Sequence, residues 1–177
     1  DGKLHLDPFE AGNSVTMIGM LDDQGNEYSI TFDHNDEEPT PNGHAIVQEQ
    51  LDKATVLIMH NAAYDLTWLW ESGFKYDGPV FDTMLGEYVL QRGIKEPLSL
   101  EACAERYELD TKKQDTLKEY FKKGYTTREI PHAELAEYLS ADLHATQQLA
   151  HKLMLRLNSE DDAGLMPTVT LTNEVAV

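Results

Sequence analysis

The stretch VLIMHNAAYDLTWLW, from Val56 to Trp70, decides the fold of this chain of 177 residues. Its first part is a continuous apolar run, which is typical of a strand that is covered on both faces. Its second part places apolar residues at helical spacing from Leu66 to Trp70, which predicts an amphipathic helix. Asn61 and Asp65 stand between the two elements, just past the carboxyl end of the strand. Sites of open α/β sheets form at that end of the strands, so both residues are candidates.

The segments on either side of this stretch predict an α/β fold. A hairpin is expected over residues 15–32, because two apolar runs flank the turn DDQGNE. A short strand is expected at PVFDTM, residues 79–84, where Asp82 is a typical N-cap of the next helix. Helices are expected over residues 43–53, 83–92, 100–107 and 132–157, and Ser99 is expected to be the N-cap of the third of them. A hairpin followed by alternating helices and strands indicates a mixed β-sheet flanked by helices.

The composition excludes several classes of protein. Apolar runs are far too short to span a membrane, so a soluble protein with no membrane partner is expected. The formal net charge of −18 argues against broad nonspecific nucleic-acid binding, which needs many lysines and arginines. The negative charge is compatible with an enzyme that holds a few nucleotides through bound cations. The single cysteine, Cys103, lies in a helical apolar pattern and is expected to be a buried structural thiol in a reducing compartment.

A second pair of candidates lies on the long helix expected over residues 132–157. Tyr138 and Asp142 are four residues apart and therefore share one face of that helix. The rest of that face is apolar and includes Leu135, Leu139, Ala145 and Leu149. A carboxylate on an apolar face costs free energy unless it is paired with a base or binds a cation. The residues alone leave both a buried ion pair and a metal ligand open for Asp142.

The individual residues have simple structural explanations. Asn61 suits a turn at the end of a strand, and Asp65 suits the first turn of a helix because of the helix dipole. The combination is more specific than its parts. It consists of H-N-x-x-x-D after a buried strand, D-T-M at the start of a helix, and Y-x-x-x-D on a late helix.

These segments resemble the motifs of the DEDD-type 3′–5′ exonucleases. HNAAYD (60–65) is similar to the second motif, FDTML (81–85) to a flanking segment, and YLSAD (138–142) to the third motif. The tyrosine four residues before the last aspartate marks the DEDDy branch of the family. The other branch, DEDDh, has a histidine five residues before that aspartate, and Glu137 stands there in this chain.

The resemblance is closest to the proofreading domain of family A DNA polymerases, and SLEACAERY (99–107) agrees with it. It implies a ribonuclease H-like, three-layer fold over residues 1–158, followed in 159–177 by a linker and the start of a polymerase region. The long lysine-containing stretch between the second and third motifs resembles a phage-type polymerase more than a bacterial one. The implied partners are a single-stranded DNA 3′ end or primer-template DNA, and a polymerase domain of the same parent chain. The implied location is the cytoplasm of a bacterial cell or a phage-infected host.

The chemistry that the resemblance implies is hydrolysis assisted by two divalent metal ions, Mg²⁺ or Mn²⁺. Asp142 would bind the metal that holds the attacking water, and Tyr138 would orient that water. Asp65 would hold the second metal, and Asn61 would help to position the nucleic-acid strand. Asp82 also matches a family position, but its capping role explains it fully, so it is left out of the catalytic set.

The family's first motif, D-x-E on the first strand, is not found in the chain. Asp7 and Glu10 are the nearest acids, but their spacing differs from the motif, and Pro8 suits a central strand poorly. We therefore expect that the chain starts just after the first motif. On that expectation, the chain alone binds metal weakly and has little or no activity.

Two other functions stay open at this point. A catalytically inactive module of the same fold would serve as a DNA-binding or structural scaffold within a polymerase. An RNA-processing relative of the same superfamily would share all three motifs. The role of the segment from Lys112 to Lys123 is also open, because a basic stretch can be a solvated helix or a contact with DNA.

Overall fold

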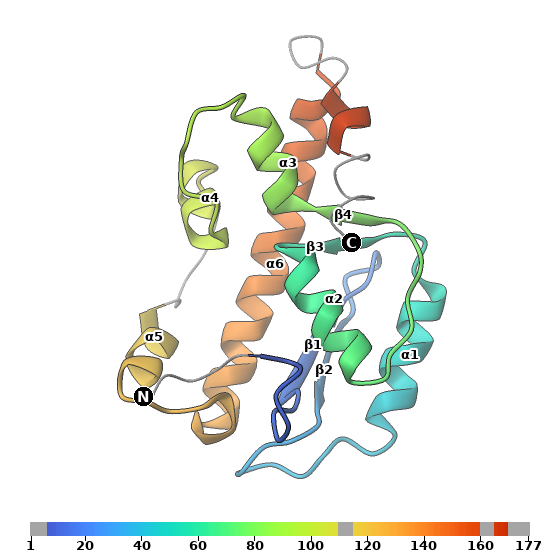
Figure 1. Ribbon diagram of the computed structural model, residues 1–177, viewed down its shortest axis with the longest axis vertical. Coiled ribbons are helices and arrows are strands. Elements are labelled where there is room, and N and C mark those ends of the chain that lie inside the picture. The colour runs from blue at the N-terminus through green and yellow to red at the C-terminus, as the bar shows by residue number, and fades with distance from the viewer. Residues whose placement is uncertain (1–6, 110–114, 160–164, 170–177) are drawn as a thin grey trace. The chain divides into compact units, whose positions relative to one another are not determined.

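The computed structural model describes residues 7–109, 115–159 and 165–169 (Figure 1). The contacts between residues divide the chain into two compact units. The first unit comprises residues 1–53, 67–76 and 112–143, and the second comprises residues 54–66, 77–111 and 144–177. Two helices, α2 (Ala62–Glu71) and α6 (His132–Leu157), contribute residues to both units.

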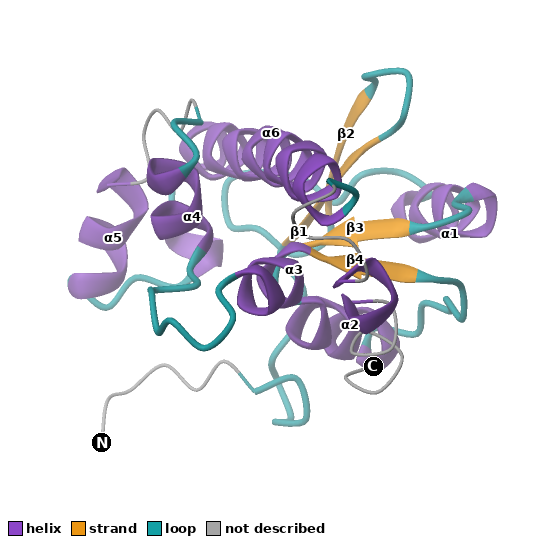
Figure 2. Cartoon of the chain, turned by 90° about the horizontal axis from the view of Figure 1, so that it is seen from above, coloured by secondary structure: helices purple, strands orange, loops and turns teal. Residues whose placement is uncertain are grey.

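The first unit is built on the predicted hairpin. Strands β1 (Met17–Leu21) and β2 (Glu27–Thr31) pair antiparallel, and Figure 2 draws all strands in orange. The turn between them is held by the carboxylate of Asp22, which accepts hydrogen bonds from the backbone N–H groups of Gln24 and Asn26. Gly25 has a φ of 83°, a conformation that glycine adopts without steric cost. The hairpin prediction is thus confirmed.

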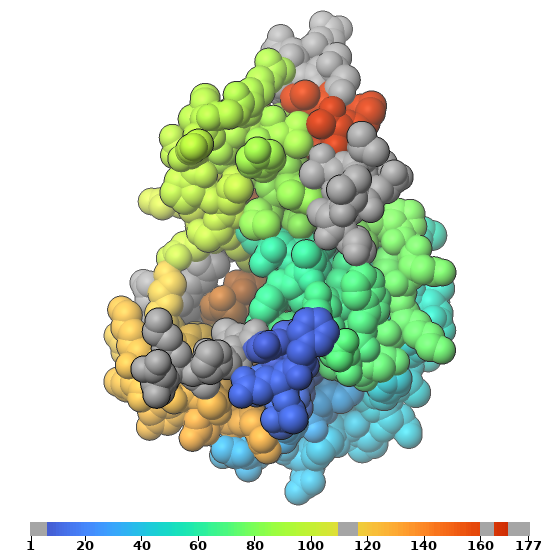
Figure 3. Space-filling model, in the orientation of Figure 1, coloured from blue at the N-terminus to red at the C-terminus, as the bar shows by residue number. Residues whose placement is uncertain are grey.

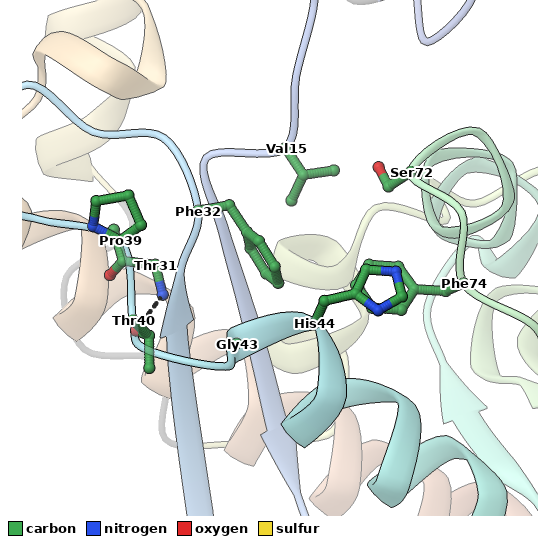
Figure 4. Close-up of a pocket in the computed structure, with 9 residues that line it drawn as sticks. All are labelled: Val15, Thr31, Phe32, Pro39, Thr40, Gly43, His44, Ser72 and Phe74. Carbon is green, nitrogen blue, oxygen red and sulfur yellow. Dashed lines mark hydrogen bonds between the residues drawn. The ribbon is translucent and has the colours of Figure 1, made fainter.

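Helix α1 (Gly43–Lys53) covers the same unit and has the predicted bounds. Its first residue approaches β2 so closely that a Cβ on Gly43 would lie 2.8 Å from Ile30 Cγ2. Beside it, the ring of Phe74 stacks on His44 at a centroid distance of 4.2 Å. These side chains border a pocket of about 220 Å³, drawn in Figure 4 with the nine residues that line it. None of the candidate site residues is among them.

The first unit also contains the second half of α2, α5 (Asp115–Lys122), the 3₁₀ turn η1 (Thr127–Glu129) and the first half of α6. A small apolar cluster joins these elements. Its buried members are Leu117, Ile130 and Leu135, and the partly buried Met17, Tyr120 and Tyr138 pack against them. The candidate Tyr138 therefore belongs to a packed cluster.

The second unit contains the other strand pair. Strands β3 (Leu57–Met59) and β4 (Val80–Asp82) are parallel, and Met59 lies opposite Asp82. The helices of this unit include α3 (Thr83–Leu90) and α4 (Leu100–Arg106), together with the first half of α2 and the second half of α6. The predicted α/β class is confirmed. In the described residues, the strands form two separate two-stranded sheets, one antiparallel and one parallel.

One expectation about β3 is wrong. The apolar run at residues 55–60 predicted a strand covered on both faces, but Ile58 in its middle is 41% exposed. Leu57 and Met59 on the opposite face are only partly buried. The physical reason is that apolar character alone does not produce a covering layer. Among the described strands, β3 pairs with β4 alone, and the face that carries Ile58 stays accessible to solvent.

The core of the second unit lies between α3, α4 and the second half of α6. Its buried members include Phe81, Leu90, Cys103, Leu149, Leu153 and Leu157. Cys103 is fully buried, as predicted, and its burial raises the pKa of its thiol. Beside the core, the buried carboxylate of Glu87 accepts hydrogen bonds from Arg106 and from the hydroxyl of Tyr107, each at 2.7 Å. Burial and that bond raise the pKa of Tyr107 to about 12.

The sequence predicts helix N-caps at Asp82 and Ser99. The predicted N-caps are both present, since Asp82 and Ser99 accept hydrogen bonds from the backbone of Met84 and Ala102. In the described part of the chain, no helix combines the length and the apolar character that crossing a membrane requires. Of residues 159–177, where a linker and the start of a polymerase region are expected, residues 160–164 and 170–177 lie outside the described residues.

Candidate active site

In the second unit, one buried carboxylate, that of Asp82, fixes the start of α2 by hydrogen bonds. Asp82 is only 3% exposed and accepts three backbone hydrogen bonds. Its Oδ1 accepts from the N–H groups of Met84 at 2.8 Å and Asn61 at 3.0 Å. Its Oδ2 accepts from the N–H of Ala62 at 2.9 Å. Asp82 therefore caps α3 and also fixes the backbone from which α2 begins.

Asn61 forms the sharp turn between β3 and α2. Its φ is 66°, in the left-handed region that asparagine tolerates better than most residues. Its carbonyl accepts a hydrogen bond from the N–H of Tyr64 at 3.0 Å, and its side chain is exposed. The turn explains why an asparagine stands here. A contact between its side chain and nucleic acid remains a prediction.

The side chain of His60 connects the end of β3 to two other segments of the second unit. Its Nε2 donates a hydrogen bond to the carbonyl oxygen of Leu98 at 2.9 Å. Its Nδ1 lies 2.9 Å from the hydroxyl of Thr83, which is the first residue of α3. Burial lowers the pKa of His60, although the nearby charge of Asp82 and the Leu98 carbonyl act in the opposite direction. The neutral imidazole therefore ties the motif segment to two neighbouring elements.

Asp65 lies in the first turn of α2 and is exposed. An acid at this position is favoured by the dipole of the helix. Leu66, the next residue, is 1% exposed and anchors the helix in the core. The buried Leu66 and the hydrogen bonds to Asp82 thus hold the backbone of Asp65 from both sides while its carboxylate faces the surface.

The first unit contains the other two candidates, Tyr138 and Asp142, on α6. They lie one helical turn apart, and both are half-buried. Tyr138 packs against the cluster of Leu117, Ile130 and Leu135. The predicted apolar face is confirmed in its buried members, since Leu135, Ala145 and Leu149 are at most 8% exposed.

Strand β1 supports the same stretch of α6 at very close range. A Cβ on Gly19 would lie 2.6 Å from Leu139 Cγ and 3.0 Å from Leu143 Cδ1. The absence of a side chain at Gly19 therefore permits the helix to lie directly on the strand. Ser140 adds a polar contact, because its hydroxyl donates to Glu27 of β2 at 3.0 Å. The hairpin thus holds the segment that carries Tyr138 and Asp142.

The N-terminal end of α6 is fixed by side chains of the hairpin and of the loop after it. The hydroxyl of Thr31 lies 2.9 Å from His132 Nε2. His34 Nε2 donates to the carbonyl of Ile130 at 2.9 Å, and its Nδ1 accepts from the backbone N–H of Asp36. Arg128 forms an ion pair with Asp33 at 2.7 Å. These contacts set where the helix begins and therefore where Tyr138 lies along it.

Asp7 and Glu10, the described acids nearest the N-terminus, do not lie in a strand. Asp7 accepts a hydrogen bond from the backbone N–H of Phe9 at 2.9 Å, and Glu10 N–H donates to the Asp7 carbonyl at 3.2 Å. Both residues lie in an exposed turn. The structure therefore agrees with the view that Asp7 and Glu10 are not the D-x-E motif.

The donor atoms of Asp65 and Asp142 have the chemistry that a hard divalent cation prefers, because both are carboxylate oxygens. Within residues 7–109, 115–159 and 165–169, however, no three His, Cys, Asp or Glu side chains come together as a metal-binding group.

The structure brings the predicted residues together as two pairs. Asn61 and Asp65 share the start of α2, and Tyr138 and Asp142 share one face of α6. The contact of His60 with Thr83 and the second role of Asp82 were not predicted from the sequence. The signal for the second role was available, because the carboxyl ends of adjacent parallel strands meet at one edge of a sheet, and Asp82 ends such a strand.

Comparison with known proteins agrees with the motifs. The model of the 3′–5′ exonuclease family of the DNA polymerase A type matches residues 6–158. Over 101 residues, or 57% of the chain, the sequence is 33% identical to DNA polymerase I of Synechocystis sp.. The matched stretch is 10% of that relative's length. With the motif residues on elements α2, β4 and α6, and with a family match over most of its length, the chain belongs to the 3′–5′ exonuclease family of the DNA polymerase A type.

Proposed function

We propose that this chain is the proofreading domain of a DNA polymerase and removes mismatched nucleotides from DNA 3′ ends. The observation that carries the proposal is the pairing of Tyr138 and Asp142 on one half-buried face of α6, in a member of a 3′–5′ exonuclease family. In the reaction, a water oxygen attacks the last phosphodiester, and the bond from phosphorus to the 3′ oxygen of the preceding nucleotide breaks.

Each candidate residue has one task in this proposal. Tyr138 orients the attacking water through its hydroxyl, and the packing of its ring keeps the hydroxyl in place. Asn61 helps to position the strand. Two divalent ions, Mg²⁺ or Mn²⁺, are the proposed cofactors, and Asp65 and Asp142 are the ligands that this chain contributes. The other ligands that the proposal requires are the two acids of a D-x-E motif on the first strand of the family's fold.

The test is degradation of 5′-labelled single-stranded DNA in Mg²⁺ or Mn²⁺. It compares this chain with a version extended by about thirty residues encoded upstream, a length that covers one strand and its loop. We expect the extended version to degrade DNA and Asp142→Asn to lower its rate about a thousandfold, roughly 4 kcal/mol. Glu137→Gln, an exposed acid on the same helix, is the matched control and is expected to keep the rate.

A catalytically inactive scaffold is the second candidate. The observation that favours it is the exposed turn formed by Asp7 and Glu10, which leaves the described residues without the first motif. If neither version degrades DNA although both are folded, the scaffold is correct and the nuclease proposal fails. Degradation of RNA 3′ ends in preference to DNA would favour the RNA-processing alternative.

A further inference from the structure

The segment around α5 is the only basic concentration in the sequence. Residues 112–128 contain six of the 14 lysines and arginines and only two of the 32 acids. A strand of nucleic acid is repelled by a chain with a net charge of −18, so any surface that binds one must concentrate positive charge locally. Lys112 and Lys113 lie outside the described residues, and the other residues of the segment can be placed.

Helix α5 turns one face inward and the other to solvent. Leu117 is 3% exposed and packs with Tyr120 in the cluster that contains Tyr138. Lys118 and Lys122 on the helix and Lys123 directly after it are exposed. In the described part of the chain, no ion pair joins Lys122 or Lys123 to another side chain. Lys122 and Lys123 therefore present their charges on the exposed surface of the described structure.

Two large aromatic side chains lie among these lysines. Phe121 is 42% exposed and Tyr125 is 41% exposed. Aromatic rings of this size are usually covered, so their exposure next to three lysines requires an explanation. We call the exposed residues Lys118, Phe121, Lys122, Lys123 and Tyr125, which lie on α5 and on the turn directly after it, the basic–aromatic face of α5. The segment that carries it lies on the surface of the molecule in Figure 3.

The face is rigid at its C-terminal end. Gly124 has a φ of 84° and ends the helix, with hydrogen bonds from Gly124 N–H to Phe121 O and from Tyr125 N–H to Tyr120 O. These bonds turn Tyr125 back against the helix, where its ring meets Tyr120 at 5.5 Å with planes 70° apart. The hydroxyl of Tyr120 in turn donates to Glu134 of α6 at 3.1 Å. The ring of Tyr125 is thus held in place before any ligand arrives.

We propose that the basic–aromatic face of α5 binds single-stranded DNA, the lysines contacting phosphates and the exposed rings stacking on bases. Surfaces that bind single strands combine these two features, because every base has a face for stacking and every nucleotide carries a phosphate. This inference rests on the proposed function, since it names a surface that receives the strand. The packing of Leu117 and Tyr120 with Tyr138 connects the face to the stretch of α6 that carries Tyr138.

The test is binding of a fluorescent single-stranded oligothymidylate, followed by anisotropy at several salt concentrations in EDTA, so that no DNA is degraded. Lys122→Gln/Lys123→Gln is compared with Lys75→Gln/Lys95→Gln, which removes two exposed lysines elsewhere. We expect the α5 variant to bind about tenfold more weakly at low salt and its salt slope to be smaller by about 1.4, since each lost phosphate contact in single strands contributes roughly 0.7. The control pair is expected to match the wild type.

The proposed stacking of bases on the exposed rings is tested with separate variants at Phe121. Phe121→Ala is expected to weaken binding about fivefold or more without changing the salt slope, and Phe121→Trp is expected to restore it. If wild type and the α5 variants bind equally, the inference is wrong while the nuclease proposal stands. If the wild type binds no single strand, or binds duplex more tightly, the inference is also wrong. Loss of activity in Asp142→Asn tests the proposed function separately.

Discussion

The two pairs of candidate residues are held by different kinds of interaction. Tyr138 and Asp142 lie on a helix that apolar side chains press against a hairpin, with Leu139 directly over Gly19. Asn61 and Asp65 follow a turn that is held by hydrogen bonds between backbone N–H groups and one buried carboxylate, Asp82. The first arrangement depends on shape and volume, and the second depends on a few directed polar contacts. Mutations should therefore damage the two regions in different ways.

The largest effect on stability is expected from Asp82→Ala. The change leaves three backbone N–H groups without their acceptor, two of them at the start of α2 and one in the cap of α3. Loss of a cap and burial of unsatisfied donors together cost about 3–5 kcal/mol. Urea unfolding of the chain measures this cost.

Two variants test whether the loss comes from these hydrogen bonds. Asp82→Asn keeps the shape and one acceptor oxygen, and we expect it to lose about half as much stability. Asp77→Ala, an exposed acid in the same unit, is expected to change the free energy of unfolding by less than about 0.5 kcal/mol. Equal stability of Asp82→Ala and wild type would contradict the capping role.

The packing of α6 on the hairpin is expected to be disrupted by a larger side chain at Gly19. Gly19→Ala places a methyl group 2.6 Å from Leu139 Cγ, so the helix or the strand must move. Overpacking of this kind costs about 1–3 kcal/mol. The combined variant Gly19→Ala/Leu139→Ala relieves the clash and is expected to cost less than the sum of the single changes. Strictly additive losses in thermal unfolding would show that the two residues do not press on one another.

At Tyr138, one substitution distinguishes the contribution of the ring to packing from the contribution of the hydroxyl to catalysis. Tyr138→Phe keeps the ring in its cluster and removes only the hydroxyl. We expect an unfolding free energy within about 1 kcal/mol of wild type and a rate of DNA degradation about 10- to 100-fold lower, because an attacking water is less well oriented. The active, extended version of the chain is used for the rate. An unchanged rate would remove Tyr138 from the proposed reaction.

The smallest expected effect is a change of stability with pH, and it concerns the hydrogen-bonded turn that carries Asn61 and Asp65. Burial lowers the pKa of His60 in the folded chain below its ordinary value of 6.5. Between the two values the unfolded chain binds a proton that the folded chain does not, so stability is lost as pH falls through 6.5 towards the folded pKa. His60→Gln lacks this titration. The difference in unfolding free energy between wild type and His60→Gln should therefore change across that range, and a constant difference would contradict the expectation.

Features that depend on repeating patterns could be predicted from the sequence. The bounds of α1 and α6 followed from apolar residues at helical spacing, and the hairpin followed from two apolar runs around a turn with Gly25. The caps at Asp82 and Ser99 followed from local residue preferences. The burial of β3 could not be predicted in the same way, because the exposure of Ile58 depends on which elements cover the strand.

The sequence by itself determined the α/β class, the motif residues Asn61, Asp65, Tyr138 and Asp142, and the membership of an exonuclease family. These are properties of local spacing and residue type, which the order of amino acids contains directly. Only the tertiary structure decided that Asp82 holds the start of α2, that Gly19 admits Leu139, and that Phe121 and Tyr125 stand exposed beside lysines. Each of these depends on which segments the folded chain brings into contact or leaves open to solvent, and the free energy of such contacts arises from distances that no local pattern specifies.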